Sequence, residues 1–393
     1  MKINVAVMFG GKSVEHEVSV ISALQAIEAM DRNKYNIVPV YISKNSEIYS
    51  GEKLLDIEAY RDLDQLIKGL DAVYLYKDGQ HVYMNNVKQK LFGSKPQVID
   101  LVIPVMHGTN GEDGVLQGYL EMLGLPFAGS DTTGSAVGQD KVIMKHIFEN
   151  SNIPIVKWFW LYDFEYEDNK EEYYAQAEAI GYPVVVKPAN LGSSIGITFA
   201  ANNAELHDAI LIASEFDAKI VVEKAVENLR EVNCSVLGDV YDNDTSVIEE
   251  VSSHEDFLTF DEKYLQNAKS GKSSGMASTK REVPANLDAA LEAKVRELSK
   301  AVVRVLGSSG VCRIDFMIDG KTNEVYVNEI NSMPGSLAFY LWSPKDVSFA
   351  MIMDNLVKQA IDRERRNSRK TFTYSSNILS NYAANGTKGK LKI

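Results

Sequence analysis

Two carboxylates and an amide in neighbouring apolar segments point to metal-dependent chemistry. The segment VYVNEINSMPG begins at Val325, and the period of two that is typical of a strand places Glu329 and Asn331 on the same face as two valines. In the earlier segment VCRIDFMI, the same period places Arg313 and Asp315 on one face. A half-buried strand normally fills its inward face with apolar side chains, so these polar residues indicate a site.

The linker DGKTN carries hairpin-turn residues and predicts that the two segments pair as antiparallel strands. This fold places Asp315 opposite Glu329 and Arg313 opposite Asn331, with β-carbons about 5 Å apart. Carboxylates that close repel each other unless a cation lies between them, and hard oxygen ligands suit Mg²⁺, usually with phosphates completing its coordination. An ion pair between Arg313 and Glu329, without any metal, is an equally good interpretation of the pattern.

A lysine before a glycine-rich stretch predicts a phosphate-binding loop. The segment VVVKPANLGSSIG places Lys187 at the end of an apolar run and follows it with Gly192, Ser193, Ser194 and Gly196. A lysine at a buried strand end needs an anion, and successive backbone N–H groups in such a turn bind phosphate. Neither the Walker A order nor the GxGxxG fingerprint is present. The alternative is a solvated hairpin whose lysine extends to water.

Two further loops carry polar residues just after apolar strands. HGTNGEDG begins at His107, and GGKSVEHEVS begins at Gly10 and contains Glu15 and His16. Ligands of parallel α/β sheets bind beyond the carboxyl ends of the strands, so both loops are expected at the site. Glu15, the first acid of its loop, is favoured for holding a substrate ammonium. An acid there could otherwise only complement the helix dipole, and His107 could be a structural histidine.

The elements that position these residues alternate between strand and helix in the first third of the chain. Strands INVAVMF, YNIVPVYIS and DLVIPVM and helices VSVISALQAIEAM and VLQGYLEMLG predict a parallel sheet with helices on its faces. Later segments predict a helix (KVIMKHIFENSNI), a new strand region from Pro154, a hairpin around the glycine-rich loop, a strand (KIVVEKAV) and a helix (LDAALEAKVRELSKAVVRVLG). The polar stretch from His254 to Ser278 has little periodicity and is predicted to be a mobile loop. The end of the chain, 371–393, is expected to fray.

Composition excludes several classes of protein. The 393 residues suggest two or three domains, and 45% hydrophobic and 24% charged residues are typical of a globular protein. A net charge of −13 argues against nucleic-acid binding, although lysines can still gather at one anionic substrate. Cys234 and Cys312 follow no metal-ligand pattern and suit a reducing cytosol. The apolar run at the N-terminus is too short for a signal peptide, and no segment approaches the roughly 20 apolar residues of a membrane span. We therefore expect a cytoplasmic protein without membrane partners.

Taken together and in this order, GGKSVEHEVS, HGTNGEDGVLQG, VVVKPANLGSSIG, VEKAVENLREV and RIDFM…VNEINSMPG make the chain resemble the D-alanine–D-alanine ligase family of the ATP-grasp superfamily. HGTNGEDG and the RID…NEIN…PG set are specific together. The resemblance implies a mixed α/β, α+β fold of three domains: an N-terminal parallel α/β domain (1–136), a central ATP-grasp subdomain (137–226) and a C-terminal catalytic domain (227–393) with a mobile loop near 254–278. ATP would be held between the last two.

The resemblance also implies roles for individual residues. The residues that would bind ATP are Lys141, Lys187, Ser194, Glu223, Lys224, Val226, Glu231 and, in the mobile loop, Lys263. The ligands of two Mg²⁺ ions, or of Mn²⁺ in their place, would be Asp315, Glu329 and Asn331. The catalytic residues would be Glu15, Ser193, Arg313, Gly335 and Tyr264. The substrate-binding residues would be His107 and Ser336.

The implied reaction joins two D-alanine molecules through an acyl phosphate for peptidoglycan precursor synthesis, in a homodimer. A carboxylate is a poor electrophile, so its phosphorylation needs lysines and Mg²⁺, the later oxyanion needs donors such as Arg313, and water must be excluded. One departure concerns the second substrate, because the family usually has a Thr-Ser stretch after Pro-Gly that helps bind its carboxylate, whereas this chain has SLAFYLWSP. The alternatives are therefore a D-lactate, D-serine or other acceptor, and a non-catalytic ATP-binding protein.

Overall fold

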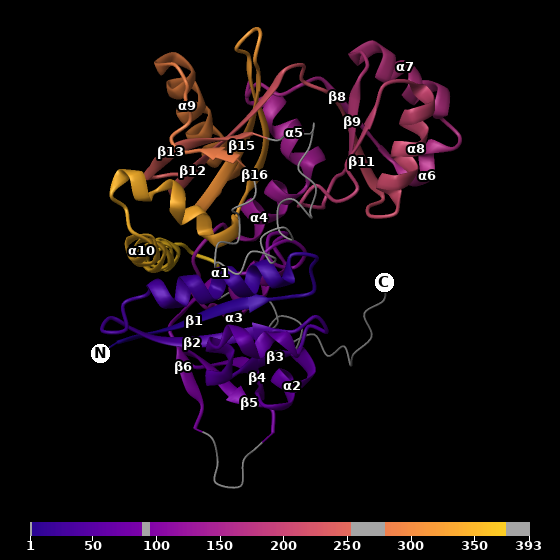
Figure 1. Cartoon of the computed structure of the whole chain (residues 1–393). Coiled ribbons are helices and arrows are strands. Elements are labelled where there is room, and N and C mark those ends of the chain that lie inside the picture. Colours follow the sequence, from indigo (N-terminus) through magenta and orange to yellow (C-terminus); the bar gives the residue numbers. More distant parts are fainter. Residues whose placement is uncertain (1, 89–94, 253–279, 375–393) are drawn as a thin grey trace, which may run out of the picture.

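The computed structural model describes residues 2–88, 95–252 and 280–374, and its strands form three sheets (Figure 1). The first sheet has seven strands in the order β6-β5-β4-β3-β2-β1-β7. Its strands are β1 (Ile3–Gly10), β2 (Tyr35–Ile42), β3 (Ile48–Ser50), β4 (Asp71–Asp78), β5 (His81–Asn86), β6 (Gln97–Ile99) and β7 (Leu101–Val105). The parallel sheet predicted from the sequence is confirmed for β2, β1 and β7, and the remaining strands add an antiparallel extension that the sequence analysis did not predict.

Helix α1 (His16–Ala29) joins the first sheet to the C-terminal part of the chain. It packs on β1 and also contacts α10 (Phe349–Asn367) and the 3₁₀ turn η5 (Gly335–Leu341) (Figure 1). Alanine and valine side chains of α1, the apolar residues of β1 and the buried face of α10 form one continuous core. The loop after β1 is therefore fixed relative to the segment that follows Pro334.

The other α-helices and the 3₁₀ helices in the first third of the chain are short. They are η1 (Glu52–Leu55), η2 (Ile57–Arg61), α2 (Leu63–Lys68), α3 (Val115–Leu123) and α4 (Thr132–Gln139). Leu116 and Leu120 of α3 pack into a second core with the opposite face of the first sheet. Together, α1 and α3 cover the two faces of this sheet, as the alternation of strand and helix predicts.

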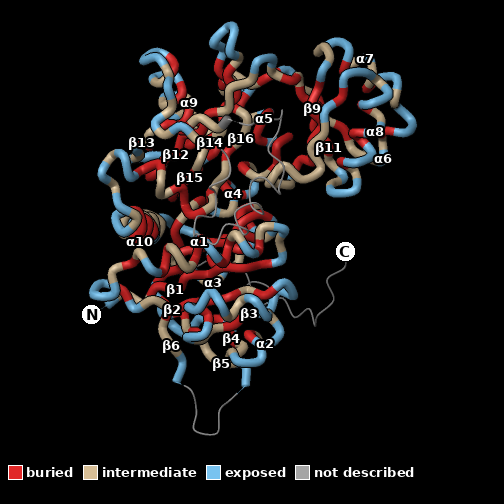
Figure 2. The backbone as a smooth tube through the Cα atoms, in the orientation of Figure 1, coloured by how far each residue is buried: buried red, intermediate tan, exposed pale blue. Residues whose placement is uncertain are grey.

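The second sheet is antiparallel, with the order β10-β9-β11-β8. Its elements are β8 (Trp158–Tyr162), β9 (Val184–Pro188), β10 (Thr198–Ala200), β11 (Lys219–Lys224), α6 (Asp163–Tyr166), α7 (Lys170–Ile180) and α8 (Asn203–Ser214). Strands β9 and β10 pair antiparallel, which confirms the predicted hairpin around the glycine-rich loop. Strands β9 and β11 are largely buried (Figure 2), and the second sheet packs against α7 and α8.

The third sheet has the order β14-β13-β12-β15-β16 and is also antiparallel. Its strands and helices are β12 (Leu229–Gly238), β13 (Asn243–Ser252), β14 (Lys280–Glu282), β15 (Gly310–Asp319), β16 (Val325–Asn331), α5 (Lys141–Asn150), α9 (Ala289–Leu306) and the short turn η6 (Ser343–Lys345). One face of this sheet packs against α5 and α9, and its core contains both cysteines. Part of the other face packs against η5 and α10, and the rest lines a site.

A β-bulge in β16 corrects the predicted faces of that strand. Asp315 pairs with Glu329 but Phe316 pairs with Val327, so Asn328 is an extra residue in β16. The bulge reverses the alternation, and while Val325 and Val327 enter the core, Glu329 faces the opposite side. The prediction that the valines share a face with Glu329 and Asn331 is therefore wrong. The strand ends in polar residues because the bulge turns them out of the core.

Other expectations have mixed outcomes. Each sheet falls inside one of the three ranges predicted as domains, and the division itself stays a prediction. The predicted mobile loop lies outside the described residues, as does 375–393. Burial raises the pKa of the Cys312 thiol to about 12. No helix within the described ranges combines the length and the apolar character that a membrane span needs.

Candidate functional site

A pocket lies where the loop after β1, the glycine-rich loop and the third sheet meet. Ten of the residues predicted for the site line this pocket, and they are Glu15, Lys141, Lys187, Ser193, Ser194, Glu231, Arg313, Asp315, Glu329 and Asn331. They come from segments more than 300 positions apart in the chain, so the fold has gathered them as the sequence analysis expects.

The hairpin of β15 and β16 has the predicted register. Asp315 lies opposite Glu329, and Arg313 lies opposite Asn331. Arg313 donates both Nε and Nη2 to Asp315, at 2.6 and 2.7 Å, and the Asn331 amide donates to Asp315 Oδ2 at 3.0 Å. The charge of Asp315 raises the pKa of the Arg313 guanidinium although burial opposes this. Arg313 is therefore paired with the acid of its own strand, two residues away.

The second carboxylate of the hairpin is paired with a lysine from the first turn of α5. Lys141 Nζ lies 3.1 Å from Glu329 Oε2 and donates to the Leu191 carbonyl at 2.9 Å. Asp140 caps α5 by accepting from two of its backbone N–H groups, which fixes where Lys141 begins the helix. In this structure, then, side-chain cations neutralise both acids that the sequence analysis assigned to a metal.

The chemistry of the donors on this hairpin fits Mg²⁺ together with a phosphorylated ligand. Within the described residues, no three acidic, histidine or cysteine side chains gather into a group that could hold a metal ion by themselves. Asp315, Glu329 and Asn331 instead offer two carboxylates and one amide oxygen on directly paired positions. Such a partial oxygen set is usual where substrate phosphates supply the remaining ligands of Mg²⁺.

Lys187, predicted to bind phosphate, is held by a buried acid. Its Nζ lies 2.7 Å from Glu223 Oε2 and 3.1 Å from Asn328 Oδ1, the residue of the bulge. Glu223 Oε1 lies 2.8 Å from the ammonium of Lys145, which is fully buried. Burial opposes the ionisation of Glu223, but the two lysines outweigh it and hold its pKa at about 2. Glu223 is thus an anchor for Lys187, and its carboxylate does not line the pocket.

Glu15 reaches across the pocket to the glycine-rich loop. The Ser193 hydroxyl donates to Glu15 Oε1, and a Cβ at Gly192 would lie 3.6 Å from Oε2 of the same carboxylate. A Cβ at Gly108 would lie only 2.9 Å from that oxygen, and Gly108 has a φ of +70°. Glycine is therefore required at 108 for both conformation and space. Ser193 and Glu15, both predicted to be catalytic, are therefore in direct contact, and their roles stay predictions.

His107 is buried behind the pocket. Its Nδ1 lies 2.7 Å from the Met333 carbonyl and its Nε2 lies 2.9 Å from Ser22 Oγ, which also accepts from the Ser336 backbone N–H. A carbonyl only accepts, so Nδ1 carries the proton, and burial lowers the pKa of the ring and keeps it neutral. His107 and Ser336 therefore position the segment around Pro334 and do not themselves line the described pocket.

Glu112, which the sequence analysis did not single out, ties the His107 loop to the same segment. One oxygen accepts from the Gly108 N–H at 2.9 Å, and the other accepts from the Met333 N–H at 2.8 Å. Burial, with the nearby charge of Glu15, raises the pKa of Glu112 to about 8. The density of acids and glycines in HGTNGEDG was a signal for this residue, but only the fold shows which acid turns inward.

The raised pKa of Glu112 predicts how stability depends on pH. The folded state keeps this proton between pH 4.5 and 8 whereas the unfolded chain loses it, so the folded state is destabilised as the pH rises through that window. We expect the melting temperature of the wild type to fall relative to that of Glu112→Gln, which cannot ionise, as the pH is raised from 5 to 8 in calorimetry. A difference that does not change with pH would contradict the assignment.

The remaining predicted residues lie elsewhere. Lys224 donates to the Tyr182 carbonyl at 3.0 Å, and neither it nor Val226 or Gly335 lines the described pocket. Lys263 and Tyr264 lie outside the described residues. Their roles stay predictions.

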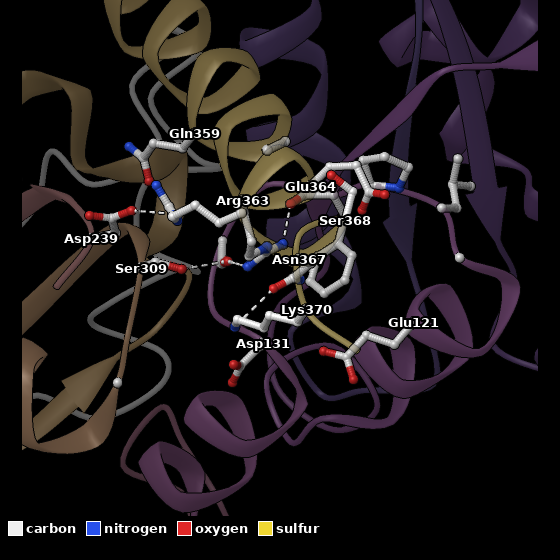
Figure 3. A pocket seen from close by; sticks show the side chains of 18 of the residues that line it. Glu121, Asp131, Asp239, Ser309, Gln359, Arg363, Glu364, Asn367, Ser368 and Lys370 are labelled. Carbon is white, nitrogen blue, oxygen red and sulfur yellow. Dashed lines mark hydrogen bonds and ion pairs between the residues drawn. The ribbon is translucent and has the colours of Figure 1, made fainter. Parts of the chain in front are cut away.

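A larger cavity of about 900 Å³ lies at the C-terminal end of α10, away from these residues (Figure 3). Two arginines that line this cavity, Arg363 and Arg366, bind other groups of the protein. Arg363 donates to the Gly129 carbonyl at 2.6 Å and to the Phe127 carbonyl, while Arg366 pairs with Asp239 at 2.7 Å. These contacts tie α10 to neighbouring loops, so we assign the chemistry to the smaller pocket, where the predicted residues meet.

The antiparallel second and third sheets, with the pocket where they meet the loop after β1, define a mixed α/β protein of the ATP-grasp class. Known proteins agree. The family model for the D-ala D-ala ligase N-terminus matches residues 4–130, and the model for the D-ala D-ala ligase C-terminus matches residues 147–358. The chain belongs to the D-alanine–D-alanine ligase family.

Individual relatives extend over almost the whole chain. The D-alanine–D-alanine ligase of Thermosipho melanesiensis is 39% identical over 380 residues, covering 96% of this chain and 98% of the relative. That of Thermosipho africanus is 37% identical, with the same coverage. Among solved structures, the D-alanine-D-alanine ligase from Coxiella burnetii superposes with a TM-score of 0.78 at 25% identity, covering 98% of both chains. The VanG D-Ala:D-Ser ligase from Enterococcus faecalis gives 0.76 at 29% identity, covering 92% of this chain and all of that one.

Proposed function

We propose that this protein is an ATP-dependent ligase that joins two D-alanine molecules and forms ADP. The observation that carries the proposal is the pairing of Asp315 with Glu329 on one pocket face, with Lys141 and Lys187 beside them. This is a set of oxygen donors and cations suited to a nucleotide phosphate with Mg²⁺. Eight curated relatives that are 33–39% identical over 92–96% of this chain bear the name D-alanine–D-alanine ligase.

The residues of the hairpin would hold the metal ions that accompany the nucleotide phosphates. When Mg²⁺ is bound, it neutralises phosphate charge and polarises the transferred group. Asp315, Glu329 and Asn331 are the residues that would hold two such ions. Arg313 would then exchange its bond to Asp315 for the developing oxyanion, as its place beside that acid allows. Gly335 would add a backbone N–H at the same oxyanion.

Lysines and the glycine-rich loop would position ATP. Lys187, fixed by Glu223, and Lys141, at the start of α5, would place ammonium groups on the phosphates. Ser194 would add a donor from the loop, and Glu231 would hold the ribose. The backbones near Glu223, Lys224 and Val226 would receive the adenine.

Glu15 would bind the ammonium of the first D-alanine, whose carboxylate then accepts the phosphoryl group. The Ser193 hydroxyl holds Glu15 by donating to it, and the Gly108 backbone lies against the same carboxylate. Lys263 and Tyr264 would complete the site from the segment 254–278. We expect a cytoplasmic protein from its composition, and a homodimer because the family resemblance implies one.

The acceptor is tested by offering D-alanine, D-lactate and D-serine together with ATP and Mg²⁺. We expect D-alanyl-D-alanine to be the main product by mass spectrometry, accompanied by ADP and phosphate. A main product that contains D-lactate or D-serine would replace D-alanine as the acceptor. If the folded protein released no phosphate in response to D-alanine, the non-catalytic alternative would be favoured.

A further inference from the structure

One cation of the pocket has no part in the proposed reaction so far. Among the described residues that line the pocket, the cationic side chains are Lys141, Lys187, Arg281 and Arg313. Lys141 and Lys187 would bind phosphates, and Arg313 would stabilise the oxyanion. Arg281, on β14, was not singled out by its sequence, since it follows a polar stretch without periodicity.

Arg281 is held against a buried acid and a tyrosine. Its Nη1 lies 3.1 Å from the Tyr340 hydroxyl and 3.5 Å from Glu249 Oε2, and its guanidinium lies 5.5 Å from the centre of the Tyr340 ring. Glu249 is 1% exposed and accepts from the Tyr340 hydroxyl at 2.7 Å and from the Asn233 amide at 3.0 Å. Glu249 and Tyr340 therefore fix the position of Arg281 in the pocket.

The register of the third sheet places this network beside the hairpin. Glu249 pairs with Asn233, Asn233 pairs with Asp315, and Asp315 pairs with Glu329, so the four form a row across β13, β12, β15 and β16. Neighbouring strands are about 4.8 Å apart, so Glu249 lies roughly 10 Å from the backbone of Asp315. The charge of Glu249 acts on Arg313. A group bound by Arg281 would hence lie beside the oxyanion residue, at a distance from the phosphate residues.

Resting on the proposed function, we propose that Arg281, positioned by Glu249 and Tyr340, binds the α-carboxylate of the acceptor amino acid. The acceptor must bring its amine to the acyl phosphate while its own carboxylate enters a pocket from which water is excluded. A carboxylate in that setting needs a cation, and arginine is the side chain best suited to it. Tyr340 belongs to SLAFYLW, which replaces the Thr-Ser stretch expected at the acceptor site. One hydrogen bond thus joins Tyr340, in the segment that differs from the family, to Arg281, the cation without a role so far.

The acceptor carboxylate can be tested with an acceptor that lacks it. D-alaninamide has the same amine and side chain but cannot be phosphorylated, so it competes with D-alanine only as acceptor. With ATP, Mg²⁺, D-alanine and excess D-alaninamide, mass spectrometry gives the ratio of D-alanyl-D-alanine to its amide. We expect the wild type to favour the dipeptide and Arg281→Met to lower that ratio by about 10- to 100-fold. Arg281→Lys should recover part of the preference, and Tyr340→Phe should lie between.

Arg230→Met is the matched control. Arg230 makes a two-bond pair with Glu250, the neighbour of Glu249 on β13, and does not line the pocket. The Arg230→Met substitution removes an arginine–glutamate pair from the same sheet and should leave the product ratio at the wild-type value. An unchanged ratio in Arg281→Met overturns the proposal, and if that variant does not fold, an unchanged ratio in both Arg281→Lys and Tyr340→Phe does so. If the wild type formed neither product, the ligase function itself would instead be overturned.

Discussion

Glu329→Gln should lower turnover by about 10²- to 10³-fold or more and leave the protein folded. Glu329 supplies one of the two carboxylates of the proposed Mg²⁺ site and is the partner of Lys141, 3.1 Å away. The amide keeps the size of the side chain but removes its charge, so the metal site loses one of its two carboxylates and Lys141 loses its carboxylate partner. The measurement is D-alanine-dependent release of ADP, with circular dichroism to follow the fold.

Glu324→Gln is the control for this substitution. Glu324 lies in the turn before β16, is exposed and accepts from the Tyr326 hydroxyl. It carries the same change in the same hairpin away from the pocket, so its turnover should equal that of the wild type. Near-normal turnover in Glu329→Gln would show that this carboxylate is not a metal ligand.

Lys187→Met should weaken ATP binding by about 10- to 100-fold, the range expected for loss of a charged hydrogen bond to phosphate. The methionine fills the space of the lysine stem, and Glu223 keeps its ion pair with Lys145, so the interior retains one compensated charge pair. Isothermal titration with a non-hydrolysable ATP analogue and Mg²⁺ measures the change directly.

The same substitution at Lys170 provides the comparison. Lys170 begins α7, beside the second sheet, and pairs with Glu167 on the surface. Its loss should leave nucleotide affinity unchanged. If Lys187→Met bound the analogue as tightly as Lys170→Met, the phosphate role of Lys187 would be rejected, and its only function would be to compensate Glu223.

The sequence predicts well what depends on local pattern. Alternation and turn residues predict the β15–β16 hairpin with its register, and the glycine-rich loop is confirmed as a hairpin between β9 and β10. The apolar runs predict the parallel core of β2, β1 and β7. Strands β15 and β16 are joined by a short turn, and β1 and β2 by one helix, so these pairings have local signals, whereas β1 pairs with β7 although β2 to β6 lie between them in the chain.

What the sequence misses depends on contacts between distant segments. The bulge at Asn328 leaves no mark in the pattern, since one extra residue changes the faces of a strand without changing its composition. The partner of Lys187 is 36 positions away, and the acid that binds Arg281 lies on another strand, so neither pairing has a local signature. Glu223 illustrates the consequence, because the resemblance implies a role for it in ATP binding but gives no sign that its carboxylate is the counter-ion of two lysines.

The most direct measurement of the whole account is a crystal structure of the protein with ADP, Mg²⁺ and D-alanine. The account predicts a Mg²⁺ ion about 2.1 Å from oxygens of both Asp315 and Glu329, with nucleotide phosphates completing its coordination. Lys187 should contact a phosphate, and Arg313 should have left Asp315. A nucleotide bound with its phosphates elsewhere, and Arg313 still paired with Asp315 without a metal, would contradict it.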